Sequence, residues 1–226
     1  MKFNLKGPGL ACIIFLFGIT TLYSQKEGGI YYFSFNIAEA LVSEVKVERK
    51  DRKVLSGWSV MEDFPEEICE EIRTLTEETL SSKLNAEVEC IYNKTKKGKL
   101  ITSNSMGGMD QVRLEGMPFV NFKQAQAQHS KDLYLFINVE VKDGGVAKID
   151  WGNGRSKVKP MITLDVKAYN ASKDVVWKKS VKLKDFGKLR QQVEENDRVK
   201  LRKSETLGAE DIYYMYEMAL EALVKA

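Results

Sequence analysis

Alternation of apolar and polar residues is clearest in the second half of the chain. Residues 133–141 (LYLFINVEV) carry an apolar side chain at every second position, as a strand with one buried face does. Residues 161–169 and 175–183 alternate in the same way around the polar segment 170–174, which predicts a β-hairpin. Aromatic and β-branched residues predict two further strands, at 30–37 and 86–92. The expected buried side chains of the second hairpin strand are Val175, Trp177, Val181 and Leu183.

Apolar residues recur every three or four positions in two longer segments, which is the spacing of one helical face. The first segment is 64–84, where Asp63 is a natural N-cap and Glu66 completes a capping box. The second is about 206–225, and residues 121–130 predict a shorter helix. The expected buried stripe of the last helix consists of Ile212, Met215, Tyr216, Ala219, Leu220 and Leu223.

These elements predict a mixed α/β fold, in which two main amphipathic helices pack on a mixed sheet of about five or six strands. Between them, residues 100–118 predict an irregular loop and residues 143–159 a Gly-rich connection. Residues 38–50 fit a broken strand about as well as a helix. Residues 186–204 are highly charged, which is typical of an exposed helix or a loose linker.

The first 24 residues have the order of a secretory signal peptide. Lys2 and Lys6 precede an apolar run of 13 residues (10–22), and the small residue Ser24 follows it. A membrane-spanning helix needs about 20 residues, so we expect cleavage after Ser24 rather than an anchor. The apolar run follows Cys12 instead of preceding it, so we expect no lipid anchor. The mature chain should be periplasmic or extracellular, with no transmembrane segment.

Removal of this segment changes the charge balance. The full chain has 35 basic and 32 acidic residues, a net charge of +3. Two lysines leave with residues 1–24, so the remainder has 33 basic and 32 acidic residues, a net charge of +1. This balance gives no argument for nucleic acid as a partner. Residues 25–226 suit a single exported domain.

Two cysteines, Cys69 and Cys90, remain after cleavage. An even pair in an oxidising compartment favours a disulfide. Cys69 lies near the start of the helix 64–84, and Cys90 lies in the strand that returns from its end. The helix descends roughly 22 Å at ~1.5 Å per residue, and the strand climbs back about 17–20 Å at ~3.3 Å per residue, so the sulfurs could meet. The alternative is two separate buried thiols.

One local pattern in the second half resembles a known group of proteins. The segment ITLDVKAYNASKDVVWKKSV (162–181) combines a strand, a short polar turn and a strand with Val-Val-Trp. A helix–strand pair precedes it and an amphipathic helix closes the chain. This order of elements over 64–226 resembles the envelope domains of the TolB amino-terminal and CsgG type. The resemblance implies a role in envelope assembly or protein docking, and it implies no catalytic residue.

One group of residues suggests a metal site. Met106, Met109 and Met117, with His129 further on, offer soft ligands that select Cu(I). The alternative is that the methionines fill gaps in the core or in loops. His129 is the only histidine, so histidine-based catalysis would have to use it, and we favour a surface or helix-terminal histidine. No cofactor is expected.

Aromatic residues supply the binding candidates. Trp151, with Arg155 nearby, could stack on a sugar ring or on a partner side chain, or could instead cover a sheet edge. Tyr213 and Tyr214 are candidates because, together with Tyr216, they cannot all face the core of one helix. The alternative is that these tyrosines pack against the sheet.

Charged residues leave two interpretations open. The basic clusters could form a patch for anionic envelope polymers or lipid headgroups, but they alternate with acids as ordinary solvated faces do. These clusters are Lys46–Lys53, Lys94–Lys99, Lys178–Lys188 and Arg198–Lys203. The glutamates of the helix 64–84 are expected on an open convex surface, where they favour solubility.

No catalytic signature is found in the sequence. The leading hypothesis is a non-enzymatic exported domain that docks onto another envelope protein or polymer. The alternatives are a carboxylate-based hydrolase acting on envelope glycans, which needs two carboxyl groups about 5–10 Å apart across a cleft, and the Cu(I) site above.

Overall fold

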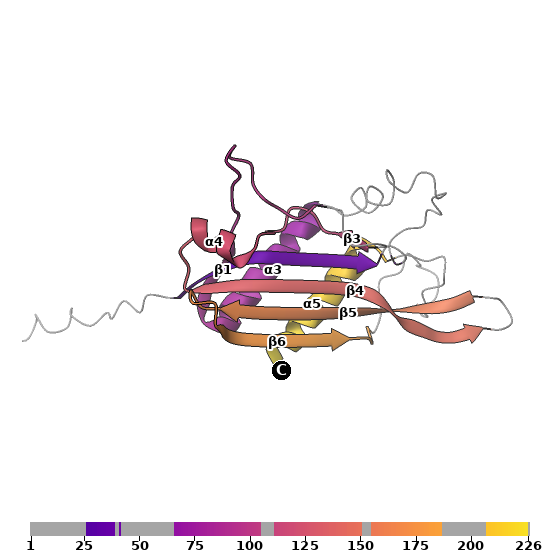
Figure 1. The fold of residues 1–226 in the computed structure, drawn as a ribbon. Coiled ribbons are helices and arrows are strands. Elements are labelled where there is room, and N and C mark those ends of the chain that lie inside the picture. Colours follow the sequence, from indigo (N-terminus) through magenta and orange to yellow (C-terminus); the bar gives the residue numbers. More distant parts are fainter. Residues whose placement is uncertain are drawn as a thin grey trace, which may run out of the picture.

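A mixed β-sheet organises the chain in the computed structural model (Figure 1). The structure describes residues 26–38, 41, 66–104, 111–150, 155–186 and 207–225. The strands are β1 (Lys26–Ala38), β2 (Ala86–Cys90), β3 (Gln111–Arg113), β4 (Leu133–Asp150), β5 (Arg155–Tyr169) and β6 (Val175–Leu183). The helices are α3 (Glu66–Leu84), α4 (Phe122–Gln128) and α5 (Ala209–Lys225). The sheet order is β2-β1-β4-β5-β6, and β3 pairs with β1.

The central position of β1 explains its composition. β1 runs parallel to β2 and to β4, whereas β4, β5 and β6 form an antiparallel meander. Parallel neighbours need a crossover connection, and α3 lies between β1 and β2 in the chain. Because β1 is covered on both faces, nearly all of its residues are buried, including the polar Ser34 and Asn36, where the Asn36 side-chain amide donates to Ser34 Oγ at 2.9 Å.

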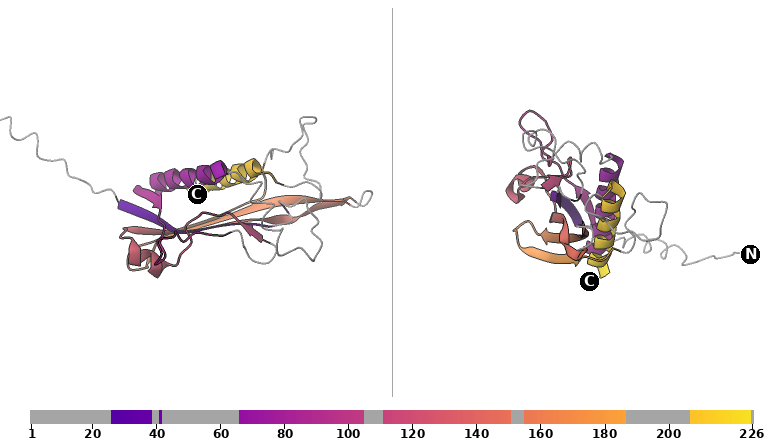
Figure 2. Two further views of the ribbon diagram at one scale, coloured as in Figure 1. Left: turned by 90° about the horizontal axis from the view of Figure 1, so that it is seen from above. Right: turned by 90° about the vertical axis from the view of Figure 1, so that its right-hand side faces the viewer.

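The main core lies between one face of the sheet and the helices α3 and α5 (Figure 2). Every second residue of β4 from Leu133 to Val141 and of β5 from Ile162 to Ala168 points into it, and so does the stripe predicted for the last helix, whose six side chains are all buried. The hydroxyls of Thr76 on α3 and Tyr216 on α5 lie 2.7 Å apart within this core. This hydrogen bond satisfies two buried polar groups where the helices meet.

The opposite face, called the second face below, carries an aromatic cluster under α4. Phe122 of α4 contacts Tyr31, Tyr134 and Tyr169 edge-on, with ring centroids 5.1–5.8 Å apart. A β-bulge in β1 next to Tyr31 places Tyr31 and Tyr32 on this same face. The Asn121 side chain and Gln124 form a capping box that begins α4.

The predicted fold class is confirmed, and one connection was predicted wrongly. The expected Gly-rich connection 143–159 is largely strand, because β4 and β5 remain paired as far as Asp150 and Arg155. They extend beyond the helices as a long arm (Figure 1). The pairing register shifts between Asp143 and Val146, where Gly144 and Gly145 lie. Glycines therefore mark a bulge within a continuing hairpin rather than its end.

Candidate functional site: the open edge of β6

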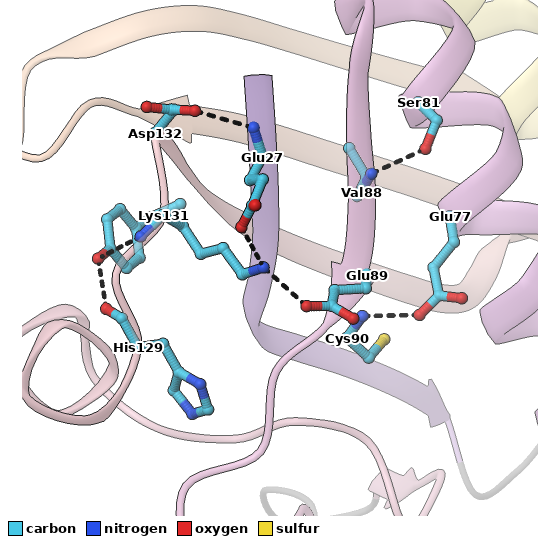
Figure 3. A network of polar contacts seen from close by, with 10 residues as sticks. Glu27, Glu77, Ser81, Val88, Glu89, Cys90, His129, Lys131 and Asp132 are labelled. Atoms are coloured by element: carbon cyan, nitrogen blue, oxygen red, sulfur yellow. Dashed lines mark hydrogen bonds and ion pairs between the residues drawn. The ribbon is translucent and has the colours of Figure 1, made fainter. Parts of the chain in front are cut away.

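The edge of the sheet formed by β2 is closed by side chains of α3 (Figure 3). The amide N–H of Val88 donates to Ser81 Oγ at 2.9 Å, and the amide N–H of Cys90 donates to Glu77 Oε1 at 2.6 Å. These N–H groups cannot be used by a further strand while the helix side chains hold them. The helix thus satisfies backbone groups that an edge strand normally exposes.

A lysine clasp beside this edge joins the start of β1, the residues just before β4 and Glu89 near the end of β2 (Figure 3). Lys131 Nζ lies 2.8 Å from Glu27 Oε2 and 2.8 Å from Glu89 Oε1. The amide N–H of Glu27 donates to the Asp132 carboxylate at 2.9 Å. Hydrogen bonds to the two glutamates raise the pKa of Lys131 above its ordinary value. The arrangement holds the strand ends together, so we assign it a structural role.

The spacing between α3 and β2 also corrects the predicted disulfide. Cys69 and Cys90 are free thiols. Cys90 lies level with Glu77, and Arg73, one turn earlier in α3, bonds Tyr92 Oη at 3.2 Å. Cys69 is eight residues from Glu77, about 12 Å along the helix at ~1.5 Å per residue, whereas disulfide-linked Cα atoms lie about 4.4–6.8 Å apart. Burial raises the pKa of both thiols, and the Glu77 carboxylate further raises that of Cys90.

The opposite edge of the sheet, β6, is built differently. No described strand pairs with its outer side. Val175 and Val176 at its start are 54 % and 52 % exposed, and they are the one adjacent pair among the large exposed apolar residues of the described chain. Val175 was expected in the core with Trp177. A register shift between Ala168 and Tyr169 inserts one residue into β6, so Val175 pairs with Tyr169 on the second face instead.

The second face of β6 is basic. Lys178 is directly opposite Lys167 of β5, and Lys182 lies four residues further along on the same face, opposite Thr163. We call Lys167, Lys178 and Lys182 the lysine row. Like charges directly opposite in a sheet are destabilising, so this pairing costs the isolated protein free energy. Asp165, opposite Ser180, is the acid within the row, which leaves it net positive. The ammonium of Lys167 also lies 5.6 Å from the centre of the Phe136 ring.

The helix side of the same edge is apolar. Trp177 and Leu183 of β6 pack against the main core and stay half-buried. α5 lies over β5 and β6, and its Tyr213 is turned toward the glutamates of α3. Met218 and Ala222 follow Tyr213 by five and nine residues, about 140° and 180° around the helix at ~100° per residue, so they are on the side of α5 turned away from α3. We call the half-buried side chains of Trp177, Leu183, Met218 and Ala222 the apolar ledge.

The tyrosines expected to bind a partner do not form one patch. Tyr216 is fully buried in the core, and Tyr213 is half-buried against it next to α3. Burial, together with nearby glutamates, raises the pKa of Tyr213. Tyr214 is the exposed one, at 37 %. The other aromatic candidate, Trp151, lies outside the described residues, and the backbone of Arg155 begins β5 at the end of the hairpin arm.

The residues of the expected Cu(I) site fall in different environments. Met117 is fully buried in the main core, and His129 is the C-cap of α4. Met106 and Met109 lie outside the described residues. Within the described ranges, no group of three or more His, Cys, Asp or Glu side chains is placed to hold a metal ion.

The β6 edge was not recognised from the sequence as a site. The sequence indicates the lysines of 178–188 as one possible patch, but the contribution of Lys167 comes from the neighbouring strand and depends on the pairing register.

None of the described helices has the length and apolar character that crossing a bilayer demands. Comparison of the chain with protein-family models, with curated proteins and with solved structures finds no match in any of the three.

Proposed function

We propose that this protein is an exported, non-enzymatic docking module that binds a partner protein by adding an extended segment of that partner to β6. The observation that carries the proposal is the difference between the two sheet edges: side chains of α3 occupy the backbone of β2, whereas β6 begins with two exposed valines and has no described strand beside it. An exposed edge of this kind is the usual acceptor for strand addition.

Two features of the sequence support the setting. The order of residues 1–24 favours export, so the partner would be met in the periplasm or outside the cell. The resemblance of 162–181 to envelope domains of the TolB amino-terminal and CsgG type includes β6 itself. The role of those domains in protein docking suggests the same kind of function here.

Site-specific photo-crosslinking in the cells that export the protein tests the proposal. A photoreactive residue replaces Val176 in one variant and Glu67, exposed on α3, in the control. We expect a single partner, identified by mass spectrometry, to crosslink from position 176 and not from position 67. The same partner should be lost when the Val175→Glu and Val176→Glu changes accompany a photoreactive residue at Ser180.

Two outcomes would overturn the docking function. One is equal crosslinking of the same partner from positions 176 and 67. The other is unchanged recovery of the partner after both valines are replaced, because a segment added to β6 must pass these side chains.

A further inference from the structure

We infer that the segment accepted by β6 alternates acidic and apolar residues, and that the lysine row contacts its acidic side chains. The inference rests on the proposed function and names the chemistry of the partner. Successive side chains of an added strand point to opposite faces of the sheet. One set would therefore lie beside the lysine row and the other beside the apolar ledge.

The cost built into the free protein points to an anionic occupant. Lys167 and Lys178 face each other across β5 and β6, and Lys182 continues the row on the exposed side of the strand. A carboxylate placed next to Lys178 or Lys182 would relieve this repulsion. Rim charges of this type mainly select the partner and steer its approach.

The other side of the edge calls for apolar side chains. Trp177 and Leu183 lie on the helix side of β6, Ala222 of α5 packs on the same core, and the half-buried Met218 lies one turn before Ala222. Burying these half-exposed groups under alternate apolar residues would add a hydrophobic contribution that grows with the area removed from water. Lys179 lies on this side as well, opposite Val166, so the ledge is interrupted at one position.

A second copy of this chain fits the edge poorly. If two β6 strands paired with each other, Lys178 and Lys182 of both copies would gather on one face of the joined sheets. Like charges brought together across strands oppose such pairing. Lysines on the edge thus disfavour self-association and favour an acidic strand.

The chain itself provides a pattern for the probe. β2 (AEVEC) alternates exposed glutamates with buried apolar residues. A nine-residue peptide of alternating Glu and Val, with blocked ends, matches the length of β6. Peptides alternating Gln with Val and Lys with Val are the matched controls. Calorimetry with the purified full-length protein measures the affinity of each peptide.

We expect the Glu peptide to bind about tenfold more tightly than the Gln peptide at low salt, and the Lys peptide to bind most weakly, because two lysines face its charged side. The Lys178→Glu/Lys182→Glu variant should reverse the order of the Glu and Lys peptides. Two further Glu peptides, N-methylated on alternate residues in the two possible registers, test for main-chain pairing. One should lose binding and the other should retain it, because only one set of amides faces β6.

The outcomes separate this inference from the docking function. Equal affinities for the Glu and Gln peptides, or an unchanged preference in the charge-reversed variant, would overturn the acidic partner while the crosslinks from position 176 could still uphold docking. If polygalacturonate displaces the Glu peptide and neither N-methylated peptide is impaired, the row binds polyanions without strand addition, which also overturns the inference. Sedimentation that finds a dimer abolished by the two valine changes would assign the edge to a second copy instead.

Discussion

An edge strand leaves backbone hydrogen-bonding groups without a neighbouring strand, and the two edges of this sheet deal with those groups in different ways. β2 is short, and two of its amides are held by Ser81 and Glu77 of the helix that precedes it. β6 is longer and has no described helix side chain bonded to its outer backbone. Its exposed side chains are those of Val175, Val176, Lys178, Ser180 and Lys182. Natural sheets protect their edges by covering them or by charging them, and this protein does one at each end.

Covering an edge strand and charging it have different consequences for the binding of a further strand. A covered edge is closed to every partner, because its donors are already satisfied. A charged edge disfavours a strand of the same sign and favours one of the opposite sign. In the function proposed above, the lysines on β6 would act both against aggregation and in the selection of a partner.

Thiol reactivity gives the largest expected contrast. Cys90 lies in β2 and Cys69 on α3; both are partly buried, and burial raises the pKa of both, so at pH 8 they remain largely protonated. Modification by a disulfide reagent should be on the order of a hundredfold slower in native than in unfolded protein, because it requires local opening. Both cysteines should react in unfolded protein never exposed to reductant, as mass spectrometry of alkylated peptides can check. A peptide linking Cys69 to Cys90 would contradict the α3–β2 register.

Opening the β2 edge should cost the most stability. Glu77→Ala leaves the partly buried amide of Cys90 without its acceptor, so we expect about 1–3 kcal/mol lower free energy of unfolding. Glu78→Ala is the matched control, since it makes the same change one position along on the exposed side of α3, and should stay within about 0.5 kcal/mol. Urea denaturation measures both. Equal effects of the two variants would mean that Glu77 does not close this edge.

The clasp beside this edge should contribute less, and its contribution should depend on pH. Lys131→Met removes both ion pairs, at a cost of about 1 kcal/mol because Glu27 and Glu89 are largely solvated. The pKa of Lys131 is raised above 10.5 in the folded protein, so its contribution is present below that pH and is lost as pH rises through the folded pKa.

The difference in unfolding free energy between the wild-type protein and Lys131→Met should therefore be constant from about pH 7 to 10 and narrow above it. Lys26→Met, an exposed lysine of the same strand end, is the control and should show no such narrowing. A gap that widens at high pH would contradict the assigned role of the clasp.

Periodicity predicted the elements well because it reports burial directly. The six expected core residues of α5 are buried, and the hairpin 161–183 has the expected partners. The Gly-rich connection failed because glycine is compatible with both a turn and a bulge, and only the partner strand decides between them. The prediction that Val175 is buried was wrong for a related reason: one residue inserted into a strand moves the side chains that precede it to the other face of the sheet.

The candidate site was harder to predict because it is a property of pairing rather than of a motif. Lys167 and Lys178 are eleven positions apart, and nothing local indicates that they face each other. The predicted disulfide was wrong for the same reason, because it also depends on how two elements are aligned. Lengths of helix and strand were estimated correctly, but the register of β2 against α3, fixed by Glu77 and Ser81, places Cys90 two turns from Cys69.

Changes at the open edge should have the smallest effect on stability. In the Val175→Glu/Val176→Glu variant, side chains that are more than half exposed are replaced, so the free energy of unfolding should stay within about 0.5 kcal/mol of the wild-type value. Urea denaturation of the two proteins in parallel measures this. A loss of several kcal/mol would mean that the two valines help to stabilise the core. The β6 edge would then be no more available to a partner than the β2 edge. Stability retained together with loss of the crosslinked partner would separate the two edges by what they do: β2 maintains the sheet, and β6 extends it.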